Sequence, residues 1–157
     1  MRIGFASDIH QVVANRKLIL AGVVVPFEKG EKAHSDGDVV YHALGESILG
    51  ALALGDLGTH FPDSDPQYKD MDSSLIIKQI KKMMDERNYK VNNIDVSITL
   101  EAPKLTPYIE EMRRNIANLL EINIDQVSVK AGTNEQLDEI GKGNAVKAES
   151  IVLLIEK

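Results

Sequence analysis

The sequence contains no cysteine and no long hydrophobic run. Without cysteine, disulfide bonds and thiolate metal ligands are excluded, so any metal ion must be held by His, Asp and Glu side chains. Without a long apolar run, no segment of the sequence is expected to span a bilayer, and we do not expect a membrane partner. The first residues also lack the basic-then-apolar pattern of a signal peptide, which predicts a cytoplasmic location.

Basic residues are also fewer than acidic residues. Lys and Arg number 18 against 24 Asp and Glu, and the net charge is −6. Binding nucleic acid through bulk electrostatics requires the opposite balance, so we do not expect nucleic acid as a partner. A small anionic ligand is compatible with this charge, because a few local cations, amides or a metal ion can hold it. The 157 residues are 43% hydrophobic and 27% charged, which predicts one globular domain covering 1–157.

Hydrophobic periodicity divides the chain into strands and helices. We expect helices from about Ser35 to Gly55, Ser73 to Arg87 and Thr106 to Leu119, with Ser35 and Asp38 forming a capping box and Thr106 an N-cap. The expected strands are Met1–Phe5, Leu18–Val25, Ile94–Leu100, Val127–Ala131 and Val146–Ile155. The order β-β-α-α-β-α-β-β predicts an α+β fold, a two-layer domain with helices packed on one face of a mixed β-sheet.

A candidate metal site begins with Asp8 and His10. Residues i and i+2 of a strand point to the same face, so these two side chains would lie together. His42, on the predicted first helix, is a candidate third ligand. Two histidines and one carboxylate form a catalytic type of zinc set with a position open to water or substrate. An Asp-x-His pair is also common without a metal, and His42 could equally be a satisfied core histidine.

Three other segments could bind a ligand. The polar run from His34 to Asp38 lies at a predicted helix N-terminus, where an anion such as phosphate is favoured, although capping alone would explain Ser35. Acids of the loop from Asp56 to Asp65 could bind hydroxyl groups or simply solvate the loop. The segments Ala102–Lys104 and Ala131–Glu135 each follow a predicted strand, and either could hold a nucleotide or only turn the chain.

Taken in chain order, these motifs closely resemble the 2-C-methyl-D-erythritol 2,4-cyclodiphosphate synthase family. The resemblance spans nearly the whole chain and rests on Asp8-x-His10, HSDGDVVYHAL at 34–44, ALALGDLGTHFPDSDP at 51–66, EAPKLTP at 101–107 and Thr133-x-Glu135. It implies a homotrimer with active sites between subunits and a phosphorus–oxygen lyase of the non-mevalonate isoprenoid pathway. The implied substrate, 4-diphosphocytidyl-2-C-methyl-D-erythritol 2-phosphate, would be closed into the cyclic diphosphate with release of CMP.

The resemblance also implies a role for each motif. Zn²⁺ would be held by Asp8, His10 and His42, and Mg²⁺ or Mn²⁺ by Glu135 on the bound substrate. His34 and Thr133 would be catalytic, stabilising charge in the transition state. Asp8, His10 and Glu135 would also contact substrate, together with Ser35, Asp56, Leu57, Gly58, Phe61, Asp63, Asp65, Ala102, Pro103, Lys104, Leu105, Thr106, Ala131, Gly132 and Asn134.

Two other functions remain open from the residues alone. A zinc phosphohydrolase would use the open metal position to activate water, and its product would be free phosphate rather than a ring and CMP. A non-catalytic nucleotide-binding trimer would close its metal with a fourth protein ligand, for which His60 is the candidate.

Some positions depart from the family pattern. Glu46 stands where many relatives have Asp, Phe5-Ala6-Ser7 replaces a common His-Gly-Phe, and Gly132 stands where Thr is common. Relatives commonly have Phe and Arg at the positions of Glu139 and Lys142, where they line a cavity on the threefold axis that can hold an isoprenoid diphosphate. We expect Glu139 to turn outwards or pair with Lys142, and binding at that axis to be weak.

Overall fold

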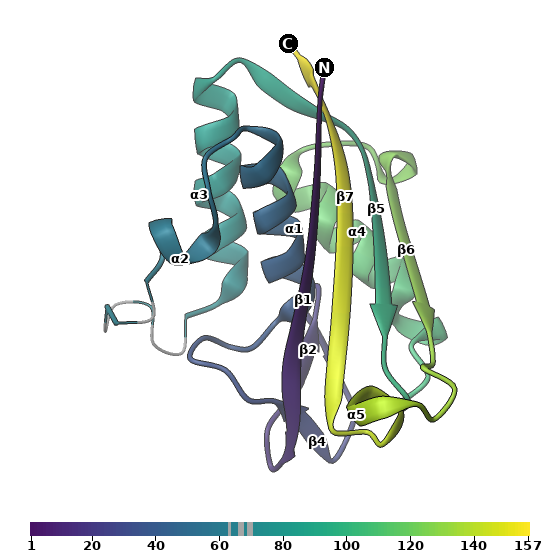
Figure 1. Ribbon diagram of the computed structural model, residues 1–157. Coiled ribbons are helices and arrows are strands. Elements are labelled where there is room, and N and C mark those ends of the chain that lie inside the picture. The colour runs from purple at the N-terminus through teal and green to yellow at the C-terminus, as the bar shows by residue number, and fades with distance from the viewer. Residues whose placement is uncertain (63, 66–67, 69–70) are drawn as a thin grey trace.

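The computed structural model describes residues 1–62, 64–65, 68 and 71–157. Their strands form a five-stranded mixed sheet in the order β4-β1-β7-β5-β6 and a separate β2-β3 pair (Figure 1). The α+β architecture predicted from the sequence is confirmed. In chain order the elements are β1 (Arg2–Ala14), β2 (Leu18–Leu20), β3 (Val23–Val25), β4 (Lys29–Glu31), α1 (Val39–Ala51), α2 (Leu57–His60), α3 (Ser73–Glu86), β5 (Tyr89–Thr99), α4 (Ile109–Leu120), β6 (Val127–Gly132), α5 (Asp138–Gly141) and β7 (Ala145–Glu156).

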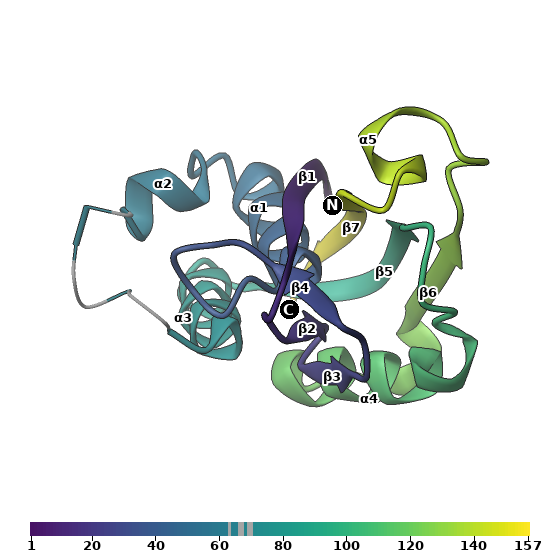
Figure 2. The same ribbon diagram turned by 90° about the horizontal axis from the view of Figure 1, so that it is seen from below.

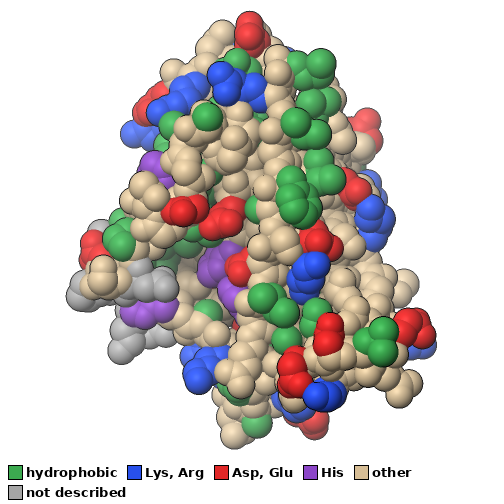
Figure 3. Space-filling model, viewed as in Figure 1, with side chains coloured by type: hydrophobic (Ala, Val, Ile, Leu, Met, Phe, Trp, Pro, Cys, Tyr) green, Lys and Arg blue, Asp and Glu red, His purple; other side chains and the backbone are tan. Residues whose placement is uncertain are grey.

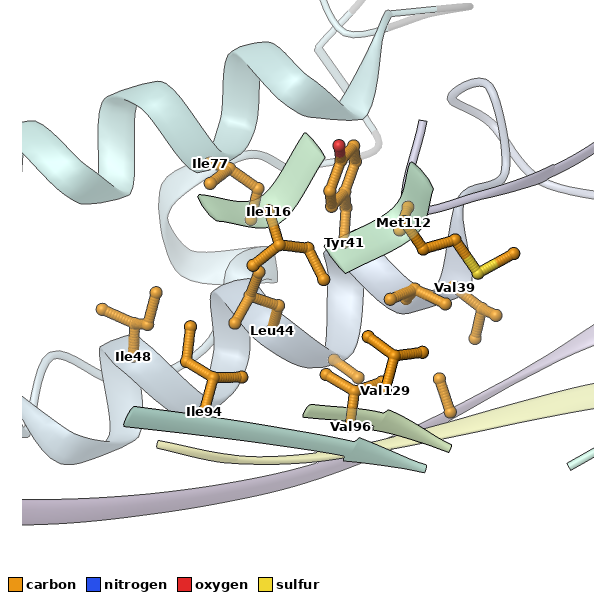
Figure 4. Close-up of a cluster of buried hydrophobic side chains, with 14 of the residues drawn as sticks. Val39, Tyr41, Leu44, Ile48, Ile77, Ile94, Val96, Met112, Ile116 and Val129 are labelled. Carbon is orange, nitrogen blue, oxygen red and sulfur yellow. The ribbon is translucent and has the colours of Figure 1, made fainter. Parts of the chain in front are cut away.

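The helices α1, α3 and α4 cover one face of the sheet, as Figure 2 shows from below. Figure 4 shows the core between the layers, where Leu44 and Ile48 of α1 and Ile116 of α4 meet Ile94 and Val96 of β5. The alternation seen in the sequence around Ile94 therefore buries one side of β5, which is the expected pattern for a sheet covered on one face.

The first strand is much longer than the predicted Met1–Phe5. Strand β1 runs antiparallel to β7 as far as Gln11, with Asp8 opposite Ala148 and His10 opposite Val146. The sequence did not predict this continuation, because β1 lines a cleft there and its residues include polar ones such as Asp8 and His10. Gly4 lets α1 approach, since a Cβ atom there would collide with the carbonyl oxygen of Ser47.

Other predicted boundaries were wrong for local reasons. Helix α1 begins at Val39 rather than near Ser35, because Asp38 is its N-cap and accepts from the amides of Val40 and Tyr41. The segment predicted as one strand at 18–25 is the hairpin β2-β3, which turns at Ala21 and Gly22, both with positive φ. Thr106 does not cap α4 but begins a short 3₁₀ helix, Thr106–Tyr108.

The other face of the sheet is open and partly apolar. Ile3, Phe5 and Ile9 of β1 are 71%, 60% and 56% exposed, and Ile151 of β7, paired with Phe5, is 44% exposed. Figure 3 shows hydrophobic side chains along this face, beside a hollow where histidine and acidic side chains gather. Within the described ranges, no helix is both long and apolar enough to cross a membrane.

Candidate active site

The three predicted metal ligands lie together. Asp8 and His10 extend from the same face of β1, and His42 faces them from the first turns of α1. Asp8 Oδ2 lies 3.0 Å from His10 Nε2 and 3.4 Å from His42 Nδ1, and the two ring nitrogens are 3.3 Å apart. Ligands about 2.0–2.2 Å from a tetrahedral zinc ion lie roughly 3.3–3.5 Å from one another. The spacing therefore fits a zinc ion bound at one face of the triangle.

The hydrogen bonds around His10 fix its tautomer. Its Nδ1 lies 2.8 Å from the carbonyl oxygen of Gly37 and 3.1 Å from Glu31 Oε2. A carbonyl oxygen can only accept, so Nδ1 carries the proton and donates. The lone pair of Nε2 is then directed at Asp8 and His42, where a metal ion would need it.

The partners of His42 place its proton in the complementary way. Ser73 Oγ donates to Asp36 Oδ1 at 2.6 Å, so that hydroxyl has used its proton and can only accept from His42 Nε2, 3.3 Å away. Ser35 Oγ lies 3.2 Å from the same nitrogen. Nε2 therefore carries the proton, and the Nδ1 lone pair of His42 points into the cluster. A cation between the three converging ligands would satisfy all of them.

The electrostatics of the cluster favour a positive charge. Burial raises the pKa of Asp8, but hydrogen bonds from His10 and His42 outweigh it and hold that pKa well below its usual range. Burial lowers the pKa of His10, while Asp8 and Glu31 raise it to about 10. The same negative surroundings that stabilise a proton here would stabilise a divalent cation, and the two compete for the Nε2 lone pair.

The cluster opens into a cleft of about 460 Å³ between β1, α1 and α2. Besides the three ligands, its lining includes five residues predicted to act in catalysis or substrate binding, which are His34, Ser35, Leu57, Gly58 and Phe61. Sequence reasoning overlooked Lys32, Pro62, Tyr68 and Ile76, which also line it. The cleft is thus lined by both polar and apolar side chains, with the three metal-type ligands among the polar ones.

Some predicted contacts are not brought into this cleft. Asp56 is the N-cap of α2, and its Oδ1 accepts from the amide of Thr59 at 2.8 Å; neither it nor Asp65 is among the described residues that line the cleft. Asp63 lies outside the described residues. His60, the candidate fourth ligand, donates from Nε2 to the carbonyl oxygen of Leu54 at 2.9 Å. In the described part of the chain, the metal-type cluster consists of Asp8, His10 and His42.

A second cleft, of about 570 Å³, lies where β5 and β6 end. Because these strands are parallel, with Thr99 opposite Gly132, the segments that follow them emerge at the same edge of the sheet. The residues predicted for the nucleotide pocket are brought together here, and the lining contains Pro103, Lys104, Leu105, Thr106, Ala131, Gly132 and Thr133. Ala102 precedes Pro103 through a cis peptide bond but is not among the described lining residues.

The loop after β6 holds Glu135 apart from the metal-type cluster. Glu135 is exposed, and its Oε1 accepts from Thr133 Oγ1 at 3.2 Å. Asn134 donates from its amide to Glu101 Oε2 at 3.3 Å and from its side chain to the carbonyl oxygen of Leu137 at 2.9 Å. The two predicted catalytic residues, His34 and Thr133, therefore line different clefts, and the described linings of those clefts share no residue.

Fold and site together define an α+β protein whose first strand and first helix present an Asp-His-His metal-type cluster in an open cleft. The chain belongs to the YgbB family, whose model matches residues 1–155. The 2-C-methyl-D-erythritol 2,4-cyclodiphosphate synthase of Chloroherpeton thalassium is 51% identical over 157 residues, which cover 100% of this chain and 99% of the relative.

Solved structures agree with this assignment. The bifunctional IspDF of Campylobacter jejuni matches with a TM-score of 0.96 and 38% identity over 99% of this chain, which spans 42% of the length of that protein. The IspF of Plasmodium falciparum, solved as a CDP complex, matches with a TM-score of 0.88 and 33% identity over 99% of this chain and 96% of that chain.

The departures from the family pattern have visible local consequences. Glu46 lines the first cleft, and its Oε1 accepts from the amide of Leu57 at 3.4 Å, where it supports the start of α2. Glu139 pairs with Lys142 at 2.6 Å and also accepts from Asn144 at 2.9 Å, so the expected pairing is confirmed. The supporting groups Ser73 and Glu31 were not predicted to act at the site, because only the folded chain brings them to the histidines. Asp36 lies in the predicted polar run 34–38, but its contact with Ser73 was not predicted.

Proposed function

We propose that this chain, as a single cyclodiphosphate synthase domain over 1–157, converts 4-diphosphocytidyl-2-C-methyl-D-erythritol 2-phosphate to 2-C-methyl-D-erythritol 2,4-cyclodiphosphate. CMP is released, which makes the enzyme a phosphorus–oxygen lyase of the non-mevalonate isoprenoid pathway acting in the cytoplasm. The observation that carries this function is the preformed Asp8-His10-His42 cluster in a chain about half identical to named synthases over its full length.

Zinc is the metal proposed for the cluster. Histidine nitrogens and one carboxylate suit its preferences, and the ligand spacing fits its tetrahedral geometry. When bound, the ion would supply Lewis-acid stabilisation of charge on the β-phosphate. Asp8, His10 and His42 would hold it, and the open cleft in front of them leaves room for a phosphate oxygen rather than a fourth protein ligand.

The proposed reaction mainly requires that the reacting groups of the substrate be held in position. An oxygen of the 2-phosphate, already ionised at neutral pH, forms a bond to the β-phosphorus. The bond from that phosphorus to the oxygen bridging the α-phosphorus breaks, and CMP leaves with this oxygen and its electron pair. No proton has to be removed from the nucleophile, so the residues of the cleft must fold the substrate and neutralise its charge. Such preorganisation can supply several kcal/mol, up to roughly 7–11.

Individual side chains are assigned within this scheme. His34 and Ser35, in the cleft beside the cluster, would contact the phosphates, and His34 and Thr133 would stabilise charge in the transition state. Glu135 would hold Mg²⁺ or Mn²⁺ on the bound diphosphate, a role suited to an exposed carboxylate. Asp56, Gly58, Phe61 and Asp63 would receive the methylerythritol part, and Leu57 would also contact substrate. The cleft at the ends of β5 and β6 would take the cytidine, with Lys104 and Thr106 at its rim.

We propose a homotrimer with each active site shared between two subunits. Two features support it. Residues assigned to one reaction lie in two clefts whose described linings do not overlap. The open sheet face also exposes Ile3, Phe5 and Ile9, an apolar strip suited to burial against other copies. A head-to-tail ring of three would set the first cleft of one subunit beside the second cleft of the next.

Product analysis tests the function against its nearest alternative, a zinc phosphohydrolase. The chain is incubated with the cytidyl substrate, zinc and magnesium, and the products are followed by phosphorus NMR. We expect CMP and a cyclic diphosphate in equal amounts. Inorganic phosphate with an uncyclised product would show that the cleft activates water instead, and would overturn the proposed lyase.

A further inference from the structure

Glu31 is a buried carboxylate that neither the family motifs nor the proposed reaction assigns. Its side chain is fully enclosed at 0% exposure, and Oε2 lies 3.1 Å from His10 Nδ1. Its other oxygen, Oε1, is buried without a hydrogen-bond partner among the described residues. Burying a carboxylate destabilises the fold unless nearby positive charge or hydrogen-bond donors compensate for the lost hydration. The position of Glu31 beside a metal-type cluster therefore needs an explanation.

The backbone fixes Glu31 in place. Strand β4 pairs with β1 so that Glu31 lies opposite Val12, two residues beyond His10. The next residue, Lys32, donates its amide to Gln11 at 2.8 Å, and Arg16 Nε donates to the Glu31 carbonyl oxygen at 3.1 Å. A hydrogen-bonded edge strand, rather than a loop, therefore holds the carboxylate of Glu31 beside His10.

Gly37 completes this arrangement from the other side. Its φ of +90° lies in the left-handed region, and a Cβ atom there would come within 2.9 Å of Glu31 Cβ. Without a side chain, the loop packs directly on Glu31, and the Gly37 carbonyl oxygen reaches His10 Nδ1 at 2.8 Å. The proton on Nδ1 is thus shared between a carbonyl oxygen and a carboxylate.

Capping of α1 does not account for Glu31. Asp38 is the N-cap, accepting from the amides of Val40 and Tyr41, whereas from this helix end Glu31 Oε2 accepts the amide of Val39 alone, at 3.0 Å. That bond holds the carboxylate in position, with the positive end of the helix dipole nearby. One more amide contact at an already capped terminus does not require a charged group with one oxygen unpaired.

We infer that Glu31 is a positioning residue of the metal site, which orients His10 and increases the basicity of its Nε2 through a carboxylate–histidine–metal arrangement. This inference rests on the proposed metal site. Glu31 is not itself a ligand, because it contacts Nδ1, while the cluster uses Nε2 on the far side of the ring. When Glu31 is ionised, its negative charge adds to that of Asp8, and the two would balance the two positive charges of a bound zinc ion.

Such outer partners usually change metal affinity by about 10–100-fold when they are altered. The test is zinc affinity, measured by competition with a chromophoric chelator on the metal-free protein. The variants are Glu31→Gln, which keeps shape and hydrogen bonding but removes the charge, and Glu31→Met, which removes both. The matched control is Asp38→Asn, which alters an equally buried carboxylate at the same helix end whose hydrogen bonds come from backbone amides and not from a histidine ring.

We expect zinc binding to weaken roughly 10-fold in Glu31→Gln and more in Glu31→Met, while Asp38→Asn loses thermal stability but stays within about threefold of the parent in zinc affinity. The visible spectrum of bound Co²⁺ should shift in the Glu31 variants only. If one Glu31 variant does not fold, zinc affinity is measured on the other variant.

Parent-like zinc affinity in a folded Glu31 variant would overturn the inference and leave the metal site standing. An equal loss in Asp38→Asn would also overturn it, because a general effect of buried charge would then explain the result. Failure of the unaltered chain to bind zinc would overturn the metal site and this inference together.

Discussion

The two clefts of this chain differ in how firmly hydrogen bonds within the chain hold their functional side chains. In the first, the metal-type ligands stand on β1 and α1, and the two histidines are held by hydrogen bonds to Glu31, Gly37 and Ser73. The second follows the ends of β5 and β6, where Lys104, Thr106 and Thr133 are all exposed. The first cleft is therefore preorganised within one chain, whereas the second presents groups that have few partners of their own.

This difference matches the demands of the proposed reaction. A metal site must hold its ligands before the ion arrives, since flexible ligands would lose affinity to ordering. A nucleotide site can be completed by the ligand and by a neighbouring subunit, so exposure there is expected rather than anomalous.

The largest effect is expected from His42→Ala, which removes one of three ligands from the first cleft. Zinc binding should be lost and CMP release should fall at least about 100-fold, the scale expected when a principal source of charge stabilisation is removed. The fold should survive, because His42 is only half-buried and is not one of the α1 residues that form the hydrophobic core. Metal analysis and CMP assays check this, with His60→Gln as the control histidine. Full activity in zinc-free His42→Ala would contradict the assignment.

A smaller and conditional effect is expected at Glu135, in the loop after β6 and outside the described lining of the second cleft. Glu135→Gln keeps the shape of the side chain but removes the charge proposed to hold magnesium. The loss of activity should be much greater at low magnesium than at high, with zinc content unchanged, whereas the exposed Glu111→Gln should match the parent. An unaltered magnesium dependence in Glu135→Gln would rule this residue out as a ligand.

The smallest effect concerns α5. Glu139 accepts from Lys142 and Asn144, which lowers the pKa of its carboxyl group and keeps a negative charge where the family resemblance led us to expect an aromatic residue. Lys142 also lacks the planar fork with which arginine holds a diphosphate. Calorimetry with geranyl or farnesyl diphosphate should therefore detect only weak binding. Tight, saturable binding of one molecule per trimer would contradict this prediction while leaving catalysis untouched.

Much of the fold could be predicted because apolar residues recur at regular strand or helix spacing in the core elements. The alternation at Ile94–Ile98 and the helical spacing around Leu44 both lie in the core, where burial dictates the pattern. The errors fall where polar residues continue a regular element. Strand β1 extends past Phe5 through Asp8 and His10, and Ala6 and Ile9 are the only apolar residues there before Val12. The turn at Gly22 was missed because the surrounding residues 18–25 are almost uniformly apolar.

The candidate site was predictable as a set of motifs but not as a geometry. Spacing suggested Asp8, His10 and His42, and the structure brings their ligand atoms together. Spacing could not reveal Glu31 or Ser73, which reach the histidines only through the pairing of β4 with β1 and the packing of α3 on α1. Nor could it reveal that His34 and Thr133 line different clefts, which is a consequence of strand order.

Subunit mixing tests most directly whether the two clefts form one site across an interface. His42→Ala damages only the first cleft and Lys104→Ala only the second. When the two inactive or weak variants are unfolded and refolded together, random trimers should contain some interfaces that pair two intact clefts, and activity should return to roughly a quarter of the parent's. Each variant refolded alone should remain inactive. Mixed trimers that form properly but recover no activity would contradict the account and place each site within a single chain.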